Sequence, residues 1–128
     1  KSQDGIDWYD LGKVLIDFDS GETNFARPSV FKRGSTYVMF YSYKGSKHDY
    51  RIGMATSVDF IVWKRCDHKL SLNLGRKSDF DSEMMCYPSV FISENTLYLF
   101  YCGNNFGRDG IGYLTADVSE FDNFISCD

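Results

Sequence analysis

Two carboxylates, Asp81 and Glu83, stand in an acidic, Met-rich stretch that runs directly into a strand-like segment; residues 78–91 read SDFDSEMMCYPSVF. Like charges this close repel each other, so we expect Asp81 to raise the pKa of Glu83. A carboxyl group whose pKa is raised can act as a proton donor near neutral pH. The alternative is that this stretch is a solvated turn without a chemical role.

The segment PSVF occurs twice, beginning at Pro28 and at Pro88, 60 residues apart. The residue before the proline is Arg27 in the first copy and Tyr87 in the second. A guanidinium binds a carboxylate or hydroxyl groups through two hydrogen bonds, and a phenol ring offers an apolar face with a polar edge. The alternative for Arg27 is an ion pair between neighbouring structural units.

The repetition extends well beyond PSVF. STYVMFYSY (residues 35–43) aligns with NTLYLFYCG (95–103), and YRIGMATS (50–57) aligns with DGIGYLTA (109–116). Large apolar residues alternate with small or polar ones in these segments, and this period of two predicts strands. A period near 60 built from short strands indicates a repeat architecture.

A further element recurs as DGIDW (residues 4–8), DFIVW (59–63) and EFDNF (120–124), and we predict that it forms the last strand of each unit. Four antiparallel strands per unit describe a β-propeller blade. We therefore predict an all-β fold and a single partial domain over residues 1–128. Its blades would span residues 26–65 and 86–126, and residues 1–10 would supply the outer strand of a preceding blade.

The expected blade count is too small for a closed ring. A propeller needs at least about four blades, whereas this chain provides two and one strand of another. Uncovered blade faces would be large apolar patches, which soluble monomers avoid. We therefore expect either a homodimer or additional N-terminal blades in a longer chain to complete the ring.

The composition, 43% hydrophobic and 25% charged over 128 residues, is typical of one globular domain. Aromatic residues make up 17% and favour strands over helices. The net charge of −4, without a basic stripe, argues against nucleic acid and anionic membranes as partners. No apolar run approaches the ~18 residues that span a bilayer.

The cysteines and histidines form no recognisable metal-binding pattern, so we expect neither a metal site nor a cofactor. We interpret the cysteines as reduced thiols, and the start of the chain is unlike a signal peptide, which together favour a cytoplasmic location. The residues concerned are Cys66, Cys86, Cys102, Cys127, His48 and His68.

These motifs resemble the repeats of the five-bladed β-propeller glycosidase superfamily, which includes glycoside hydrolase families 32, 43 and 130, and above all its uncharacterised bacterial members. The matching runs cover almost the whole chain: ARPSVFK, YVMFYS, YRIGMATS, FDSEMMCYPSVF and YLFYCGNNFGRDGIGY. The sequence departs from the superfamily's YNGN run at Cys102, where an asparagine would stand. This departure puts the polar site in doubt.

The resemblance implies a protein that acts on or binds a glycan at the mouth of the propeller channel. Glycoside hydrolysis usually needs two carboxylates that flank the bond. Glu83 stands where the general acid of such enzymes lies, with Asp81 as the group that modulates its pKa, but no segment resembles the first blade, which carries the base or nucleophile. Two functions are therefore kept open: a glycoside hydrolase, and a non-catalytic carbohydrate-binding or structural propeller.

The resemblance also implies sugar contacts around the same mouth. We expect Arg27, Arg51 and Tyr87 to be among them, together with the amides of Asn104 and Asn105. The alternatives are an ion pair for Arg51 and, for the two asparagines, a turn in which asparagine tolerates a positive φ.

Overall fold

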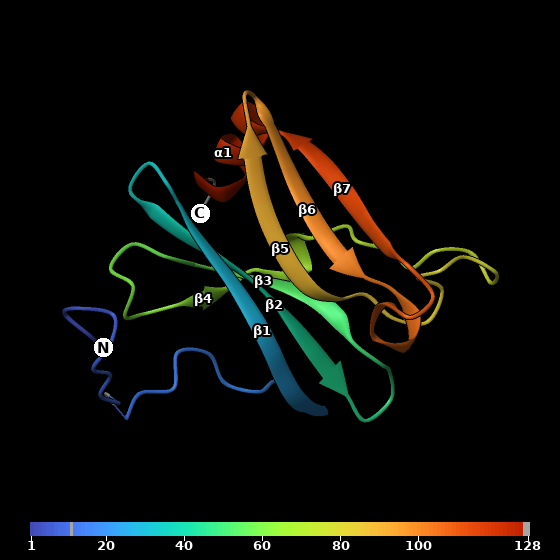
Figure 1. The fold of residues 1–128 in the computed structure, drawn as a ribbon, viewed down its shortest axis with the longest axis horizontal. Helices are drawn as coiled ribbons and strands as arrows, with labels where there is room; N and C mark the ends of the chain where they lie inside the picture. Colours follow the sequence, from blue (N-terminus) through green and yellow to red (C-terminus); the bar gives the residue numbers. More distant parts are fainter. Residues whose placement is uncertain (11, 127–128) are drawn as a thin grey trace.

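The computed structural model describes residues 1–10 and 12–126 and consists of two antiparallel sheets followed by a short helix (Figure 1). Sheet A contains β1 (Glu22–Arg33), β2 (Thr36–Gly45), β3 (Arg51–Ser57) and β4 (Lys64–Arg65). Sheet B contains β5 (Cys86–Ser93), β6 (Thr96–Cys102) and β7 (Ile111–Asp117), and α1 (Val118–Ser126) follows it. Two short 3-10 helices, η1 (Asp67–Lys69) and η2 (Asn104–Gly107), follow β4 and β6.

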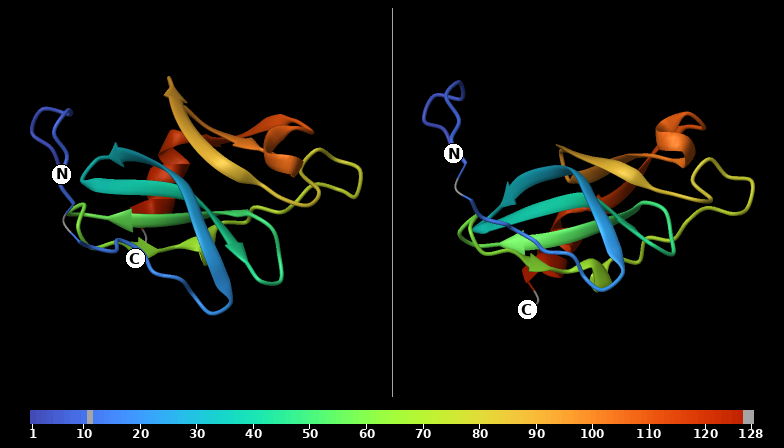
Figure 2. Two further views of the ribbon diagram at one scale, coloured as in Figure 1. Left: turned by 60° about the horizontal axis from the view of Figure 1, so that its bottom comes forward. Right: turned by 90° about the horizontal axis from the view of Figure 1, so that it is seen from below.

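The strands of each sheet are ordered as they occur in the chain, as expected for strands joined by tight connections. β5 packs beside β1 and β2, so the two sheets lie next to each other as consecutive units (Figures 1 and 2). The prediction of an all-β fold is confirmed. Within the described residues the sheets close no barrel, and they have the form of an incomplete propeller.

The main hydrophobic core lies between the two sheets. Val38, Phe40 and Met54 of sheet A are at most 2% exposed, and they belong to the same cluster as Leu97 and Leu99 of sheet B. Burial of each such side chain contributes about 1.5–3 kcal/mol. The alternating apolar residues of the repeats are therefore what holds one unit against the next.

The opposite side of sheet B is uncovered. Phe100 and Tyr113 occupy the repeat positions that Phe40 and Met54 hold in sheet A, yet they are 38% and 60% exposed, against 2% and 0%. Equivalent positions are thus covered in one unit and bare in the other. We call the following residues the outer face of sheet B: Phe91, Phe100, Ile111 and Tyr113.

The prediction that residues 4–8 and 59–63 form strands is wrong, because both segments form turns. Asp4 Oδ1 and Asp59 Oδ1 each accept hydrogen bonds of 2.8–2.9 Å from the amides two and three residues later. Such local hydrogen bonds compete with the ladder of a sheet. The short strand β4 begins only after the second turn, and residues 1–10 contribute no outer strand.

The segment 120–124, predicted as the last strand of the second unit, lies instead in helix α1. Asp117 Oδ1 accepts hydrogen bonds from the amides of Ser119 and Glu120 and so caps the start of the helix. Phe121 and Ile125 on one face of α1 are 8% exposed and join the main core. Sheet B therefore has three strands, with a helix in place of the fourth.

An ion-pair network ties the beginning of β1 to the end of sheet A. Arg65 makes two hydrogen bonds of 2.7 Å to Glu22 and further ones of 2.6 and 2.8 Å to Asp67. Asp67 also accepts hydrogen bonds from the hydroxyl of Tyr41 and the amide of Met54. The hydrogen bonds from Arg65 hold the pKa of Glu22 below its ordinary value.

In the part of the chain that the structure describes, no helix combines the length and the apolar character needed to span a bilayer. Cys66, Cys86 and Cys102 are free thiols, and burial raises the pKa of Cys86 to about 12. Cys127 lies outside the described residues.

Candidate functional site

The first strand of each sheet, β1 or β5, has a register shift at the same position of the aligned segments. The register of β1 against β2 shifts around Arg27 and Pro28, and that of β5 against β6 shifts around Tyr87 and Pro88. Arg27 and Tyr87 have φ angles of 46° and 57°. Non-glycine residues rarely adopt this left-handed conformation, and the strain of about 1–3 kcal/mol is found chiefly at binding and catalytic sites.

The two bulges bring their side chains together across the boundary between the sheets. The guanidinium carbon of Arg27 lies 4.6 Å from the centroid of the Tyr87 ring, a cation–π contact. The buried hydroxyl of Ser42 accepts a hydrogen bond of 2.7 Å from the Tyr87 amide. No carboxylate among the described residues lies within ion-pair distance of Arg27, so the alternative of an inter-unit ion pair is not what the structure shows.

Three aromatic rings gather at the Tyr87 bulge. Phe106 stacks on Tyr87 with a centroid distance of 5.9 Å and meets Tyr50 edge-on at 5.9 Å, and Tyr50 lies 6.5 Å from Tyr87. The Phe106 side chain is 54% exposed, so the group offers an apolar surface to solvent. We call Tyr50, Tyr87 and Phe106 the aromatic cluster.

The turn that carries Glu83 is held by the buried side chain of Asn104. Asn104 Oδ1 accepts hydrogen bonds from the amides of Glu83, at 2.8 Å, and Met84, at 3.2 Å. Its amide nitrogen donates to Ser82 Oγ and to the carbonyl of Asp79. Because Asn104 is only 6% exposed and its side chain is fully engaged, it positions the turn and is not available to a sugar.

Both backbone groups of Glu83 are fixed. Its amide binds Asn104, and its carbonyl accepts a hydrogen bond of 2.9 Å from the guanidinium of Arg51. The same Arg51 nitrogen donates to the carbonyl of Tyr50, a member of the aromatic cluster. Glu83 is itself exposed, and its carbonyl shares the Arg51 donor with the carbonyl of Tyr50, so its backbone is tied to that of the aromatic cluster.

Asp81 occupies a different environment from Glu83. It is 8% exposed, and its Oδ2 accepts a hydrogen bond of 2.6 Å from the Tyr101 hydroxyl. Burial and this hydrogen bond both raise the pKa of Tyr101, which keeps the hydroxyl a donor. The role of Asp81 as a partner of Glu83 stays a prediction.

The contacts of Arg51 and Asn105 differ from the ion pair and the pair of sugar-binding amides that the sequence suggested. Arg51 donates to the carbonyls of Asp49, Tyr50 and Glu83 rather than to a carboxylate. Asn105 has a φ of 54°, so the positive-φ turn is confirmed for this residue, and its amide donates to Asp109.

Sequence reasoning missed Tyr50 and Phe106. Phe106 adopts a φ of 59°, a conformation that is rare for an aromatic residue and that its sequence does not indicate. Tyr50 borders the aligned YRIG run but appears there as one more strand aromatic. Within the described ranges no cluster of side chains has the composition of a metal site.

No family model matches the chain. Two uncharacterized proteins of Mycobacterium tuberculosis, from the strains CDC 1551 and H37Rv, are each 33% identical to it over 118 residues. The match covers 91% of this chain but 38% of each relative. The chain thus corresponds to little more than a third of the length of these curated relatives.

Solved structures share the fold. The chain superposes on a glycoside hydrolase with a TM-score of 0.66 and 25% identity, which covers 82% of this chain and 30% of that one. It has a glycoside hydrolase-like fold. A structure described as a BT0996 complex with RGII matches with a TM-score of 0.67 and 25% identity, over 84% of this chain and 31% of that one. Zg3597, a family 117 glycoside hydrolase of the marine bacterium Zobellia galactanivorans, matches in fold with a TM-score of 0.65 and 17% identity, over 80% of this chain and 38% of its own.

Proposed function

We propose that this chain forms part of a glycan-binding site in a glycoside hydrolase-like protein of the five-bladed propeller type. The aromatic cluster would receive the apolar face of a sugar ring, and Glu83 would act as the general acid. The observation that carries the proposal is the exposed Glu83, whose amide and carbonyl are both hydrogen-bonded and whose carbonyl shares the Arg51 donor with Tyr50 of the aromatic cluster. One structural neighbour is described as a complex with RGII, which supports a glycan ligand.

Glycoside hydrolysis usually needs a second carboxylate opposite Glu83, which acts as base or nucleophile. Asp81 does not suit this role because it is buried and bound to Tyr101. We propose that the second carboxylate comes from another blade, which would place the complete catalytic pair in a larger assembly. In the absence of that blade, the part of the site present here would still bind a sugar.

Binding is tested by replacing Phe106 with alanine. The exposed ring is packed on Tyr87 and Tyr50 but is not part of the main core, so we expect glycan affinity to fall about tenfold, the equivalent of about 1.4 kcal/mol, with little change in stability. Calorimetric titration with oligosaccharides of known composition measures the affinity. Phe91→Ala is the matched control, because Phe91 is similarly exposed but lies on the outer face of sheet B. Equal effects of the two substitutions would argue against the aromatic cluster as the platform.

A second proposal concerns assembly, and the outer face of sheet B supports it. The equivalent positions of sheet A are covered by a neighbouring sheet, so we propose that another blade covers this face and continues the ring. That blade would come from a second copy or from a longer polypeptide.

Light scattering distinguishes the two sources of the additional blade. A second copy predicts a mass near twice 14.7 kDa that returns to the monomer value in Phe100→Lys. A longer polypeptide predicts a monomer whose exposed face binds an apolar dye. A monomer that binds no dye would contradict the assembly proposal.

A further inference from the structure

Two arginines at the candidate site, Arg27 and Arg51, lack the carboxylate partner that three other arginines of the described residues have. Three arginines elsewhere contact carboxylates: Arg33 with Asp122, Arg65 with Glu22 and Asp67, and Arg108 with Asp109. Among the residues that the structure describes, neither Arg27 nor Arg51 has such a partner. Two guanidinium charges without carboxylate partners therefore flank the aromatic cluster.

Arg27 is held in place without using up its hydrogen bonds. Its position is set by the left-handed backbone of the bulge and by the Tyr87 ring, over which the guanidinium lies at 4.6 Å. The contact with the ring uses none of the guanidinium's hydrogen-bond donors, because the N–H groups point outward from the edge of the group. The side chain is exposed, so these donors are open to a ligand.

No acidic side chain among the described residues, the exposed Glu83 included, forms an ion pair with Arg27. Asp49 is paired with Lys44 at 2.9 Å, and the hydrogen bond from Lys44 lowers the pKa of Asp49. Asp81 is buried against Tyr101. One guanidinium nitrogen of Arg51 donates hydrogen bonds to three backbone carbonyls, which carry no net charge.

We infer that the glycan recognised at this site is acidic and carries a carboxylate that Arg27 binds through two parallel hydrogen bonds. This inference rests on the glycan-binding function proposed above and specifies the class of sugar, a uronic acid. A planar guanidinium matches a carboxylate better than it matches a single hydroxyl, and the contact with Tyr87 holds the guanidinium at the aromatic cluster. Arg51, bonded to the carbonyls of Tyr50 and Glu83, adds a second positive charge at the site.

The test compares ligands that differ in the charged group alone. A tetramer of galacturonic acid and its carboxyl-reduced galactose counterpart are titrated into the protein by calorimetry at low and at high salt. We expect the acidic tetramer to bind at least about tenfold more tightly at low salt, and the difference to shrink at high salt because salt screens exposed charges. Arg27→Met should bring the affinity for the acidic tetramer down to that for the neutral one, with a much smaller change in the neutral value.

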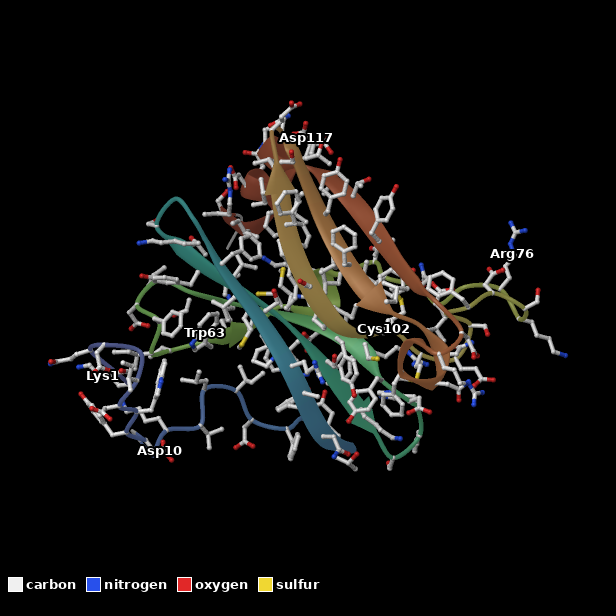
Figure 3. The ribbon with its side chains drawn as sticks, in the orientation of Figure 1. Lys1, Asp10, Trp63, Arg76, Cys102 and Asp117 are labelled. Atoms are coloured by element: carbon white, nitrogen blue, oxygen red, sulfur yellow. The ribbon has the colours of Figure 1, made fainter. Side chains whose placement is uncertain are left out.

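Arg76→Met is the control. Arg76 is also exposed, but it lies on the loop between η1 and β5, and Figure 3 shows it far from the end of β6, which Cys102 marks. Equal affinity for the two tetramers, or an equal effect of Arg27→Met on both, would overturn the inference and leave glycan binding intact. Tighter binding of a sulfated neutral tetramer than of the uronate would overturn the assignment to a carboxylate. Failure of every tetramer to bind, together with failure of the wider oligosaccharide panel, would instead count against the proposed function itself.

Discussion

Replacing Arg65 by methionine is expected to lower the free energy of unfolding by about 3 kcal/mol, because it leaves two carboxylates, Glu22 and Asp67, close together without their cation. The Glu22 and Asp67 side chains are 8% and 20% exposed, so water replaces the lost interactions incompletely. The guanidinium also lies over the rings of Phe25 and Tyr41, and these contacts are lost as well. Urea denaturation of the wild type and the variant measures the change.

Arg33→Met is the matched control. Arg33 makes a comparable bidentate contact with Asp122, but the side chains are 28% and 41% exposed, and we expect a loss of less than about 1 kcal/mol. Losses of equal size would show that the Arg65 network is no stronger than a surface pair.

Acidification provides an independent check on the Arg65 network. Because the pKa of Glu22 is lower in the folded chain than its ordinary 4.5, its contribution is complete above that pH and is lost as the pH falls below it. This acid-dependent loss should be smaller in Arg65→Met.

Replacing Glu83 by glutamine is expected to reduce glycosidic cleavage by about 10²–10⁴-fold in the assembly that supplies the second carboxylate, because glutamine cannot donate the proton. Binding should persist, since the substitution leaves untouched both the backbone contacts of residue 83 and the aromatic cluster. The rate of product formation and the affinity are measured on the same oligosaccharide.

Glu94→Gln serves as the control for Glu83, because Glu94 is also exposed but lies in the connection between β5 and β6. Cleavage that continues unchanged in Glu83→Gln would exclude Glu83 as the acid and favour the interpretation of its turn as a structural cap. A parallel loss of binding and cleavage would indicate a role in ligand contact instead.

The strands and the equivalence of the two units could be predicted because they depend on short-range alternation and on repetition. Matching the two PSVF segments placed Arg27 and Tyr87 at equivalent positions, and the structure brings their side chains into contact. The recurring element at residues 4–8 and 59–63 was recognised but was assigned the wrong conformation. Its aspartate binds the amides that follow it, and this local preference outweighs the tendency of Ile and Val to form strands.

The parts of the site that could not be predicted depend on long-range packing. Asn104 binds the amide of Glu83 across 21 residues, and nothing in the asparagine pair indicates which member turns inward. Arg65 meets Glu22 across 43 residues of chain. Which residues form such pairs depends on the three-dimensional path of the backbone. Short-range sequence patterns do not determine that path.

The matched bulges have a consequence for how such a site can diversify. In both sheets the residue before the proline has the same left-handed backbone at the same register shift, whatever side chain it carries. One copy here presents a charge and the other a ring, at Arg27 and Tyr87. A substitution at such a position can change the chemical character of the exposed surface there, while the backbone of both sheets is preserved.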